Sequence, residues 1–295
     1  SPFYIKPDMV APGAYINTTQ IGSTYNFTSG TSFAAPHVSG AAALLLQKNP
    51  ELQNQELKSL LMTTVQPVSN AYGQEFSLHE SGSGRLDIAN AYNAKLIISP
   101  TNFVINFSPE QLSIEKQLEL KLIEGEIEEI NVKFEGPEFI EFTHNIKNNK
   151  LQIELNVIGE EYGEHEGKIF INHEKTQYTI PVLMHYTEGS ILVNQENEKL
   201  FFEIEHPDKW SFAKISVTNS KNGNMDTTTT TPNKKTSIEI YENGEYWIEA
   251  KIKVNGNTSD AFNTIKINSL SEKIEKIELT NIPEKQIIII ISIVT

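Results

Sequence analysis

The sequence predicts a chain of several domains, in which an α/β segment is followed by two all-β sandwiches. Two observations carry this prediction. Apolar residues recur at helical spacing within residues 1–97, whereas after Leu96 they alternate with polar residues in short runs. We therefore divide the chain into residues 1–97, 98–188 and 189–295, each of an ordinary domain size.

Three helices are expected in residues 1–97. Residues 32–47 are apolar on nearly every face, which is typical of a buried helix, and Pro36 is expected near its first turn. Residues 49–65 are expected to form a second helix, with a leucine stripe that follows Asn54, a plausible N-cap. A glycine-rich turn at 82–84 then precedes a short helix.

Residues 98–188 and 189–295 each consist of short runs of period two separated by turn residues. This pattern is typical of antiparallel β-sandwiches of immunoglobulin-like type. Tyr246 follows Gly244 by two residues, a spacing at which a tyrosine hydroxyl ties the backbone across a turn. Residues 226–232 are expected to form a polar loop. The apolar run after Gln286 is too short to span a membrane and is expected to be a strand, with a truncated anchor helix as the alternative.

Charge and cysteine content exclude several classes of protein. The net charge is −14, and residues 98–188 hold seventeen Glu and no Asp against seven Lys, so no basic stripe exists to bind nucleic acid. The chain has no cysteine and therefore neither disulfides nor thiolate metal sites. His and Glu alternate within 160–168 and 171–175, so they are expected at solvated strand ends rather than as metal ligands. The sequence identifies no cofactor.

Ser32 is the candidate nucleophile. It falls at the start of the first expected helix, where its backbone N–H lacks a helical partner and lies at the positive end of the helix dipole. Gly30 is expected to allow an unusual backbone and the close approach of a substrate chain. His37 lies five residues further on, a rotation that turns it about 140° away from Ser32. We therefore expect His37 to be satisfied by a hydrogen bond of its own rather than to act as the base.

The segment "SGTSFAAPHVSGAAALLL" strongly resembles the catalytic-serine segment of the subtilisin-like serine proteases, the subtilases. Its neighbours resemble family segments in the same order: "KPDMVAPG" at 6–13, "ELKSLLMTT" at 56–64 and "GSGRLDIANAY" at 82–92. These four motifs cover residues 1–97.

The resemblance implies a three-layer α/β fold with a mostly parallel sheet and a Ser-His-Asp triad whose nucleophile is Ser32. It implies a serine endopeptidase that acts on peptides or proteins through an acyl-enzyme, with Gly30 and Thr31 beside the substrate and the oxyanion. The histidine matched by His37 is not the family's base. Asp8 and Asp87 match structural positions.

The sequence also departs from the family. The triad Asp, the triad His and the oxyanion Asn of subtilases lie upstream of the "KPD" segment, and only five residues precede Lys6 here. His79 is interpreted as a loop residue. We therefore expect a fragment of a larger protease, inactive alone and exposing surface that belongs to a core.

Four Asn-x-Ser/Thr sequons, at Asn17, Asn26, Asn106 and Asn257, are compatible with an extracellular or cell-surface protein. The sequence leaves open whether the protein is attached to a cell surface, either through the β modules or through a truncated C-terminal anchor. The rival hypothesis is a non-catalytic binding or adhesion protein that keeps a degenerate protease remnant.

Overall fold

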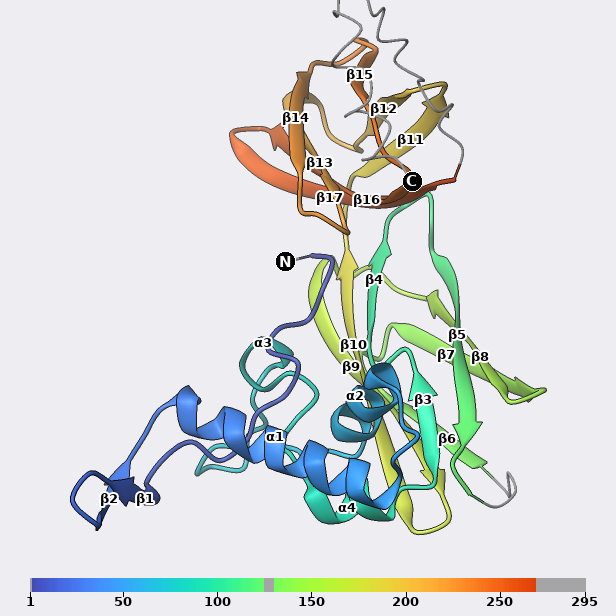
Figure 1. Ribbon diagram of the computed structural model, residues 1–295. Coiled ribbons are helices and arrows are strands. Elements are labelled where there is room, and N and C mark those ends of the chain that lie inside the picture. The colour runs from blue at the N-terminus through green and yellow to red at the C-terminus, as the bar shows by residue number, and fades with distance from the viewer. Residues whose placement is uncertain (1, 125–129, 269–295) are drawn as a thin grey trace, which may run out of the picture.

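The computed structural model describes residues 2–124 and 130–268 (Figure 1). The described part is mostly β, with few helices. The apolar run after Gln286 lies outside the described residues. The first part contains a two-stranded hairpin and four helices: β1 (Ile16–Gln20), β2 (Thr24–Thr28), α1 (Thr31–Lys48), α2 (Asn54–Thr63), α3 (Leu78–Ser81) and α4 (Ile88–Asn93).

Two four-stranded sheets follow and face each other as the first β-sandwich. One sheet has the order β3-β5-β8-β7 and the other β4-β10-β9-β6; β4 and β10 are parallel, and the other pairs are antiparallel. The strands are β3 (Leu96–Ser99), β4 (Phe103–Phe107), β5 (Ser113–Leu122), β6 (Ile130–Glu135), β7 (Ile140–Lys147), β8 (Lys150–Val157), β9 (Gly163–His173) and β10 (Thr176–Tyr186).

The second β-sandwich has sheets of three and four strands, ordered β11-β12-β15 and β14-β13-β16-β17. The Tyr246 hydroxyl donates to the Glu242 carbonyl at 2.8 Å, which confirms its expected role in tying a turn. The strands are β11 (Ser190–Glu196), β12 (Lys199–Glu205), β13 (Trp210–Asn219), β14 (Met225–Thr230), β15 (Thr236–Glu239), β16 (Gly244–Val254) and β17 (Asn257–Ile267).

Residues 226–230 form β14 rather than the expected polar loop. Their threonines are β-branched and fit a pleated edge strand, and β14 pairs antiparallel with β13. The pattern of apolar residues did not predict this strand, because most side chains of β14 are exposed and an edge strand needs few apolar side chains.

Strand β10 is buried on both faces, since all but one of its residues are shielded from solvent. One face packs against the facing sheet, and the other packs against the helical segment, where Leu183 contacts Leu78 of α3 and Ile5. This burial explains why the sequence of β10 reads as a near-continuous apolar run rather than an alternating one.

Helix α2 docks on the free edge of β3. The fully buried Ser59 hydroxyl donates to the Ile98 carbonyl at 2.7 Å and accepts from the Ile98 N–H at 3.0 Å. The Tyr178 hydroxyl accepts from the neighbouring Leu96 N–H at 2.9 Å, and burial raises the pKa of this phenol. Strand β3 therefore meets β5 on one edge and a helix on the other, across the predicted boundary at residue 97. That boundary stays a prediction.

A single hydrophobic core continues from the helices into the first sandwich. It joins Leu45 of α1 and Leu60 of α2 to Leu118, Ile153 and Ile171 of the sheets. At the surface, Glu56 at the start of α2 pairs with Lys121 of β5. The hydrogen bonds that Glu56 accepts from Lys121 and from the Gln53 N–H hold its pKa below the usual range.

The N-terminal segment also contacts the second sandwich. Phe3 stacks on Trp247 of β16 with ring centroids 5.5 Å apart and meets Phe262 of β17 edge-on. The chain therefore reaches from the second sandwich, past the first, to the helical part (Figure 1).

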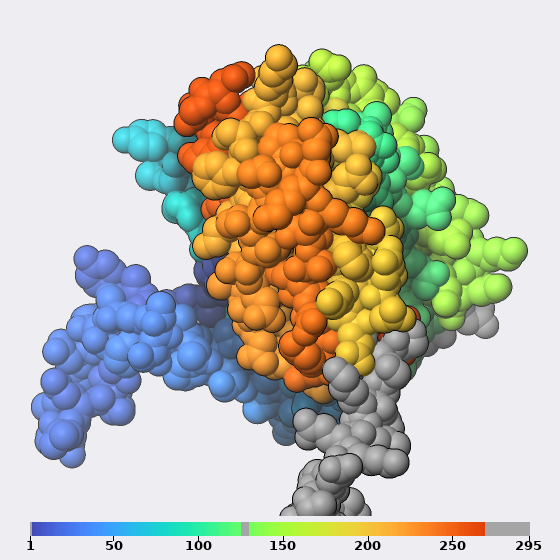
Figure 2. Space-filling view, turned by 90° about the horizontal axis from the view of Figure 1, so that it is seen from above, coloured from blue at the N-terminus to red at the C-terminus, as the bar shows by residue number. Residues whose placement is uncertain are grey.

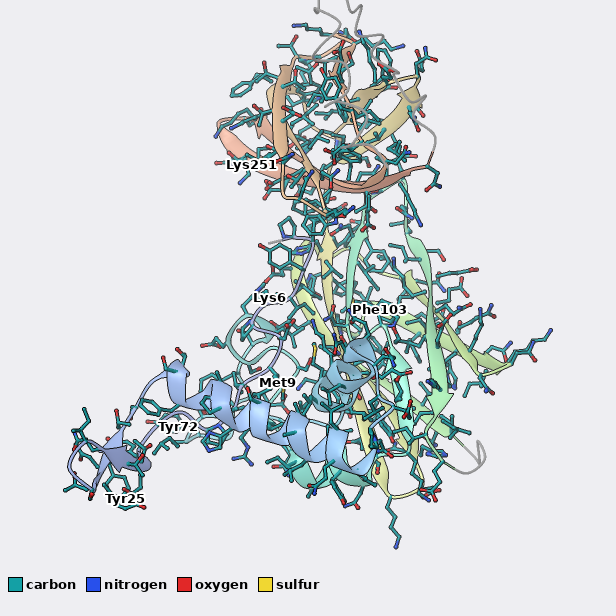
Figure 3. All side chains as sticks on the ribbon, viewed as in Figure 1. Lys6, Met9, Tyr25, Tyr72, Phe103 and Lys251 are labelled. Carbon is teal, nitrogen blue, oxygen red and sulfur yellow. The ribbon has the colours of Figure 1, made fainter. Side chains whose placement is uncertain are left out.

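Helix α1 forms where the sequence predicts it, but the prediction that it is buried is wrong for this structure. Only Ala41 and Leu45 are buried, whereas Leu44 is 44% exposed. Figure 2 shows α1 and the β1–β2 hairpin projecting as an arm from the body. On that hairpin Tyr25 (labelled in Figure 3) is 69% exposed. Phe27 on the same hairpin is 65% exposed. The structure thus shows exposed apolar side chains here, and their assignment to the core of a larger domain stays a prediction.

Local details of the helices also differ from expectation. Pro36 is the sixth residue of α1 and lies in its second turn. The N-cap of α2 is Gln53 rather than Asn54, and its N–H donates to Glu56 Oε2 at 2.9 Å.

The mostly parallel sheet that the resemblance implies does not form within residues 2–95, where β1 and β2 are antiparallel. Of the described residues, no helix combines the length and the apolar character that a membrane crossing requires.

The Ser59→Ala substitution tests the docking of α2. It leaves the buried Ile98 N–H and carbonyl without partners, so we expect the free energy of unfolding to fall by about 1–3 kcal/mol. Urea denaturation followed by circular dichroism measures this loss. The matched control is Ser39→Ala on the exposed side of α1, which we expect to change stability by less than about 0.5 kcal/mol. Equal effects of the two substitutions would contradict the role given to Ser59.

Candidate active site

Ser32 lies in the first turn of α1, one residue after the helix begins. The N-cap Gly30 offers no side chain to the helix, and Ser32 is exposed. Within the described residues, neither the hydroxyl nor the N–H of Ser32 has a hydrogen-bond partner. This N–H is among the first four of the helix, which have no partner inside it and lie at the positive end of its dipole. The arrangement presents a free hydroxyl beside a free donor.

The segment 11–13 holds the start of α1 in place. The Gly30 N–H donates to the Gly13 carbonyl at 2.7 Å, and the Tyr15 N–H donates to the Ser29 hydroxyl at 2.9 Å. A Cβ on Gly13 would lie 2.9 Å from the Gly30 carbonyl oxygen, so only glycine allows this approach. Gly30 itself has φ 162°, an extended backbone open to any residue, so the expected unusual conformation is absent. Gly13 is the residue that sequence reasoning missed.

The first and last of the four sequence motifs lie side by side. The Ser83 N–H donates to the Asp8 carbonyl at 3.0 Å, and the Val10 N–H donates to the Gly84 carbonyl at 2.9 Å. Gly82 has φ +58°, and a Cβ there would lie 2.2 Å from the Pro7 carbonyl oxygen. These contacts fix segment 6–13, which in turn positions the start of α1.

Asp8 and Asp87 serve the structure, as the sequence predicts. Desolvation opposes ionisation of Asp8, but Lys6 at 2.8 Å and Lys58 at 3.3 Å outweigh it and hold the pKa of this carboxyl below its usual range. Asp87 caps α4 by accepting from the Asn90 N–H at 3.0 Å.

His37 and His79, the histidines of the helical part, form hydrogen bonds with groups other than Ser32. His37 donates from Nδ1 to the Phe33 carbonyl at 2.8 Å, which confirms the expected hydrogen bond. His79 lies on α3 and bonds Glu164 of β9 at 2.8 Å. No His, Asp or Glu side chain contacts Ser32 within residues 2–124 and 130–268. The structure therefore contains a candidate nucleophile without a base.

Glu164 and Glu166 are exposed at the start of β9, as the sequence predicts, whereas the buried His173 departs from that prediction. Glu164 bonds His79, and Glu166 accepts from the Leu78 N–H at 2.8 Å, so both anchor α3. His173 is 1% exposed because it lies on the inward face of β9. Among the described residues, no group of three or more His, Asp or Glu is placed to hold a metal ion.

The comparisons with known proteins include one family model, which covers the helical part of the chain. The model of the subtilase family matches residues 1–84. Subtilisin BL of Lederbergia lenta is 47% identical over 68 residues, which cover 22% of this chain and 25% of that protein. A subtilisin-like protease of Arabidopsis thaliana is 37% identical over 123 residues, which cover 35% of this chain and 16% of that protein. The chain therefore spans a quarter or less of these relatives.

The minor extracellular protease Vpr of Bacillus subtilis is 32% identical over 105 residues, covering 34% of this chain and 13% of that protein. Among solved structures, titin domains I67–I69 match 59% of this chain and 65% of that chain with 9% identity and a TM-score of 0.26. A likeness of that size carries no argument about fold.

Gly82→Ala tests the contact between the two motifs. The new Cβ would collide with the Pro7 carbonyl in a backbone conformation that L residues rarely adopt, so we expect a loss of more than about 2 kcal/mol in unfolding free energy. Thermal and urea denaturation measure it. Gly73→Ala is the matched control, since Gly73 has φ +80° but open space around it, and we expect about 1 kcal/mol. A Gly82→Ala protein as stable as the control would show that the contact is dispensable.

Proposed function

We propose that residues 1–84, which the subtilase family model matches, are a C-terminal part of a subtilase catalytic region, and that Ser32 is the nucleophile of a serine endopeptidase. The observation that supports the proposal is the exposed Ser32 hydroxyl beside its unpartnered N–H at the start of α1. Gly30 and Thr31 would flank the bound peptide.

The chemistry follows from the position of Ser32. A base removes the hydroxyl proton as Oγ attacks the peptide carbonyl, and the Ser32 N–H donates to the oxyanion that forms. Collapse of this intermediate expels the amine and leaves an acyl-enzyme, which water then hydrolyses. The base, the acid that orients it and a second oxyanion donor are proposed to come from sequence upstream of the "KPD" segment, as in subtilases. Without them the chain would be inactive.

The exposed apolar arm is compatible with this proposal. Leu44 of α1 and Tyr25 and Phe27 of the hairpin present apolar surface that a soluble protein normally covers. In the proposed intact enzyme, the rest of the catalytic domain packs on this face and brings the base toward Ser32. The two β-sandwiches would be accessory modules of an exported protease, serving in substrate docking or surface attachment.

A second candidate is a non-catalytic binding protein in which the β modules carry the function. The two β-sandwiches, which make up most of the described structure, favour it. Genomic sequence upstream of Ser1 separates the candidates, because the protease requires Asp and His motifs there.

Fluorophosphonate labelling tests the proposal directly. We expect the parent protein, carrying the upstream triad residues, to be labelled at Ser32, and the 295-residue chain to react at least about 10³-fold more slowly. Ser32→Ala should abolish labelling, whereas Ser39→Ala, which removes a second exposed serine of α1, should leave it unchanged. A parent with intact upstream Asp and His that fails to label, or that labels after Ser32→Ala, would refute the assignment.

A further inference from the structure

A cleft of about 590 Å³ lies where the first sandwich, α3 and the second sandwich meet. Its walls come from Pro2 of the N-terminal segment, from α3, from the adjoining ends of β9 and β10, and from β16 and β17. Three aromatic rings line it: Tyr162, Tyr186 and Phe262. None of these elements includes Ser32 or its neighbours, so the cleft is separate from the candidate active site.

The cleft is acidic. Glu164, Glu188, Glu249 and Asp260 line it, whereas no Lys or Arg is among its described lining residues. Lys251 of β16 lies 3.5 Å from the lining residue Glu249 and is 58% exposed (Figure 3). Desolvation raises the pKa of Asp260; Lys251 opposes this effect and Glu249 adds to it. A cation bound here would relieve the repulsion between these carboxylates.

His185 provides an independent sign of a ligand. Its side chain lines the cleft, yet it is 7% exposed and makes no hydrogen bond within the described residues. Its Nδ1 lies 3.7 Å from Glu164 Oε2, which is too far for a hydrogen bond, and the other oxygen of Glu164 is taken by His79. Burial lowers the pKa of His185 and thereby favours the neutral imidazole, in which one ring nitrogen can accept a hydrogen bond.

The shape and walls of the cleft favour an organic cation over a metal ion. No described set of His, Asp and Glu has the convergence that a metal needs. Aromatic faces do suit a delocalised cation: the Tyr162 and Tyr186 centroids are 4.7 Å apart, and Phe262 lies 5.3 Å from the His185 ring. A planar guanidinium also has five donors in a fork that matches carboxylates, which an ammonium lacks.

We propose that this cleft binds an arginine side chain of a polypeptide, with the guanidinium held between the carboxylates of Glu164 and Asp260, and with His185 accepting one of its N–H groups. Because the two carboxylates belong to different sandwiches, the bound arginine links the modules. The site would thus recognise a basic polypeptide segment at a place remote from Ser32.

Titration of the 295-residue chain with short peptides tests the proposal. The probes are acetyl-Gly-Arg-Gly-amide and acetyl-Gly-Leu-Gly-amide, followed by calorimetry and by the NMR signals of the histidine rings. We expect the arginine peptide to bind at least about tenfold tighter than the leucine peptide and to shift the His185 signals. Asp260→Asn should weaken its binding about tenfold.

The matched control is Asp226→Asn, which removes the same charge from β14, at the opposite edge of the sheet that carries β17. It should leave the affinity unchanged, and Glu164→Gln serves as a second cleft variant if Asp260→Asn lowers stability. Equal affinity for the two peptides, equal weakening by the control, or displacement of the arginine peptide by calcium or zinc chloride would each overturn the proposal. None of these outcomes bears on labelling of Ser32.

Discussion

The two hydrogen bonds between the Ser59 hydroxyl and the backbone of Ile98 are the interaction on which the rest of the structure depends. They satisfy the free edge of β3 inside the protein, where an unpaired N–H and carbonyl would be costly. The helices can therefore pack into one hydrophobic core with the first sandwich. This union positions segment 6–13, and through it the start of α1 with Ser32.

The same arrangement explains why the candidate active site is only partly formed. Burial is concentrated on the side of the helical part that faces the sandwich, where Leu45, Leu60 and Leu78 pack. The opposite side of α1 and the β1–β2 hairpin remain exposed, and this is the side that presents Ser32. The proposed mechanism accordingly needs groups that the described residues do not bring to Ser32.

Much of this could be predicted from the sequence where the signal is local. The helical pattern of residues 32–47, the turn-tying Tyr246 and the rotation of His37 away from Ser32 all depend on near neighbours along the chain. The exposure of α1 could not be predicted, because burial depends on which surface packs against a helix. The roles of Ser59 and of the Glu164–His185 cleft were missed for the same reason: their partners are distant in sequence. Strand β14 was missed because exposed threonines carry no apolar alternation.

The central claim is that the helices and the first sandwich unfold as one unit, and native-state hydrogen exchange measures this most directly. Amides of α2, such as those of Leu61 and Met62, should open with the same free energy as the core amides of Ile153 and Ile171 as denaturant is raised. Exchange of the α2 amides at a clearly lower free energy, with the sandwich still protected, would show that the helices open separately and would contradict the account.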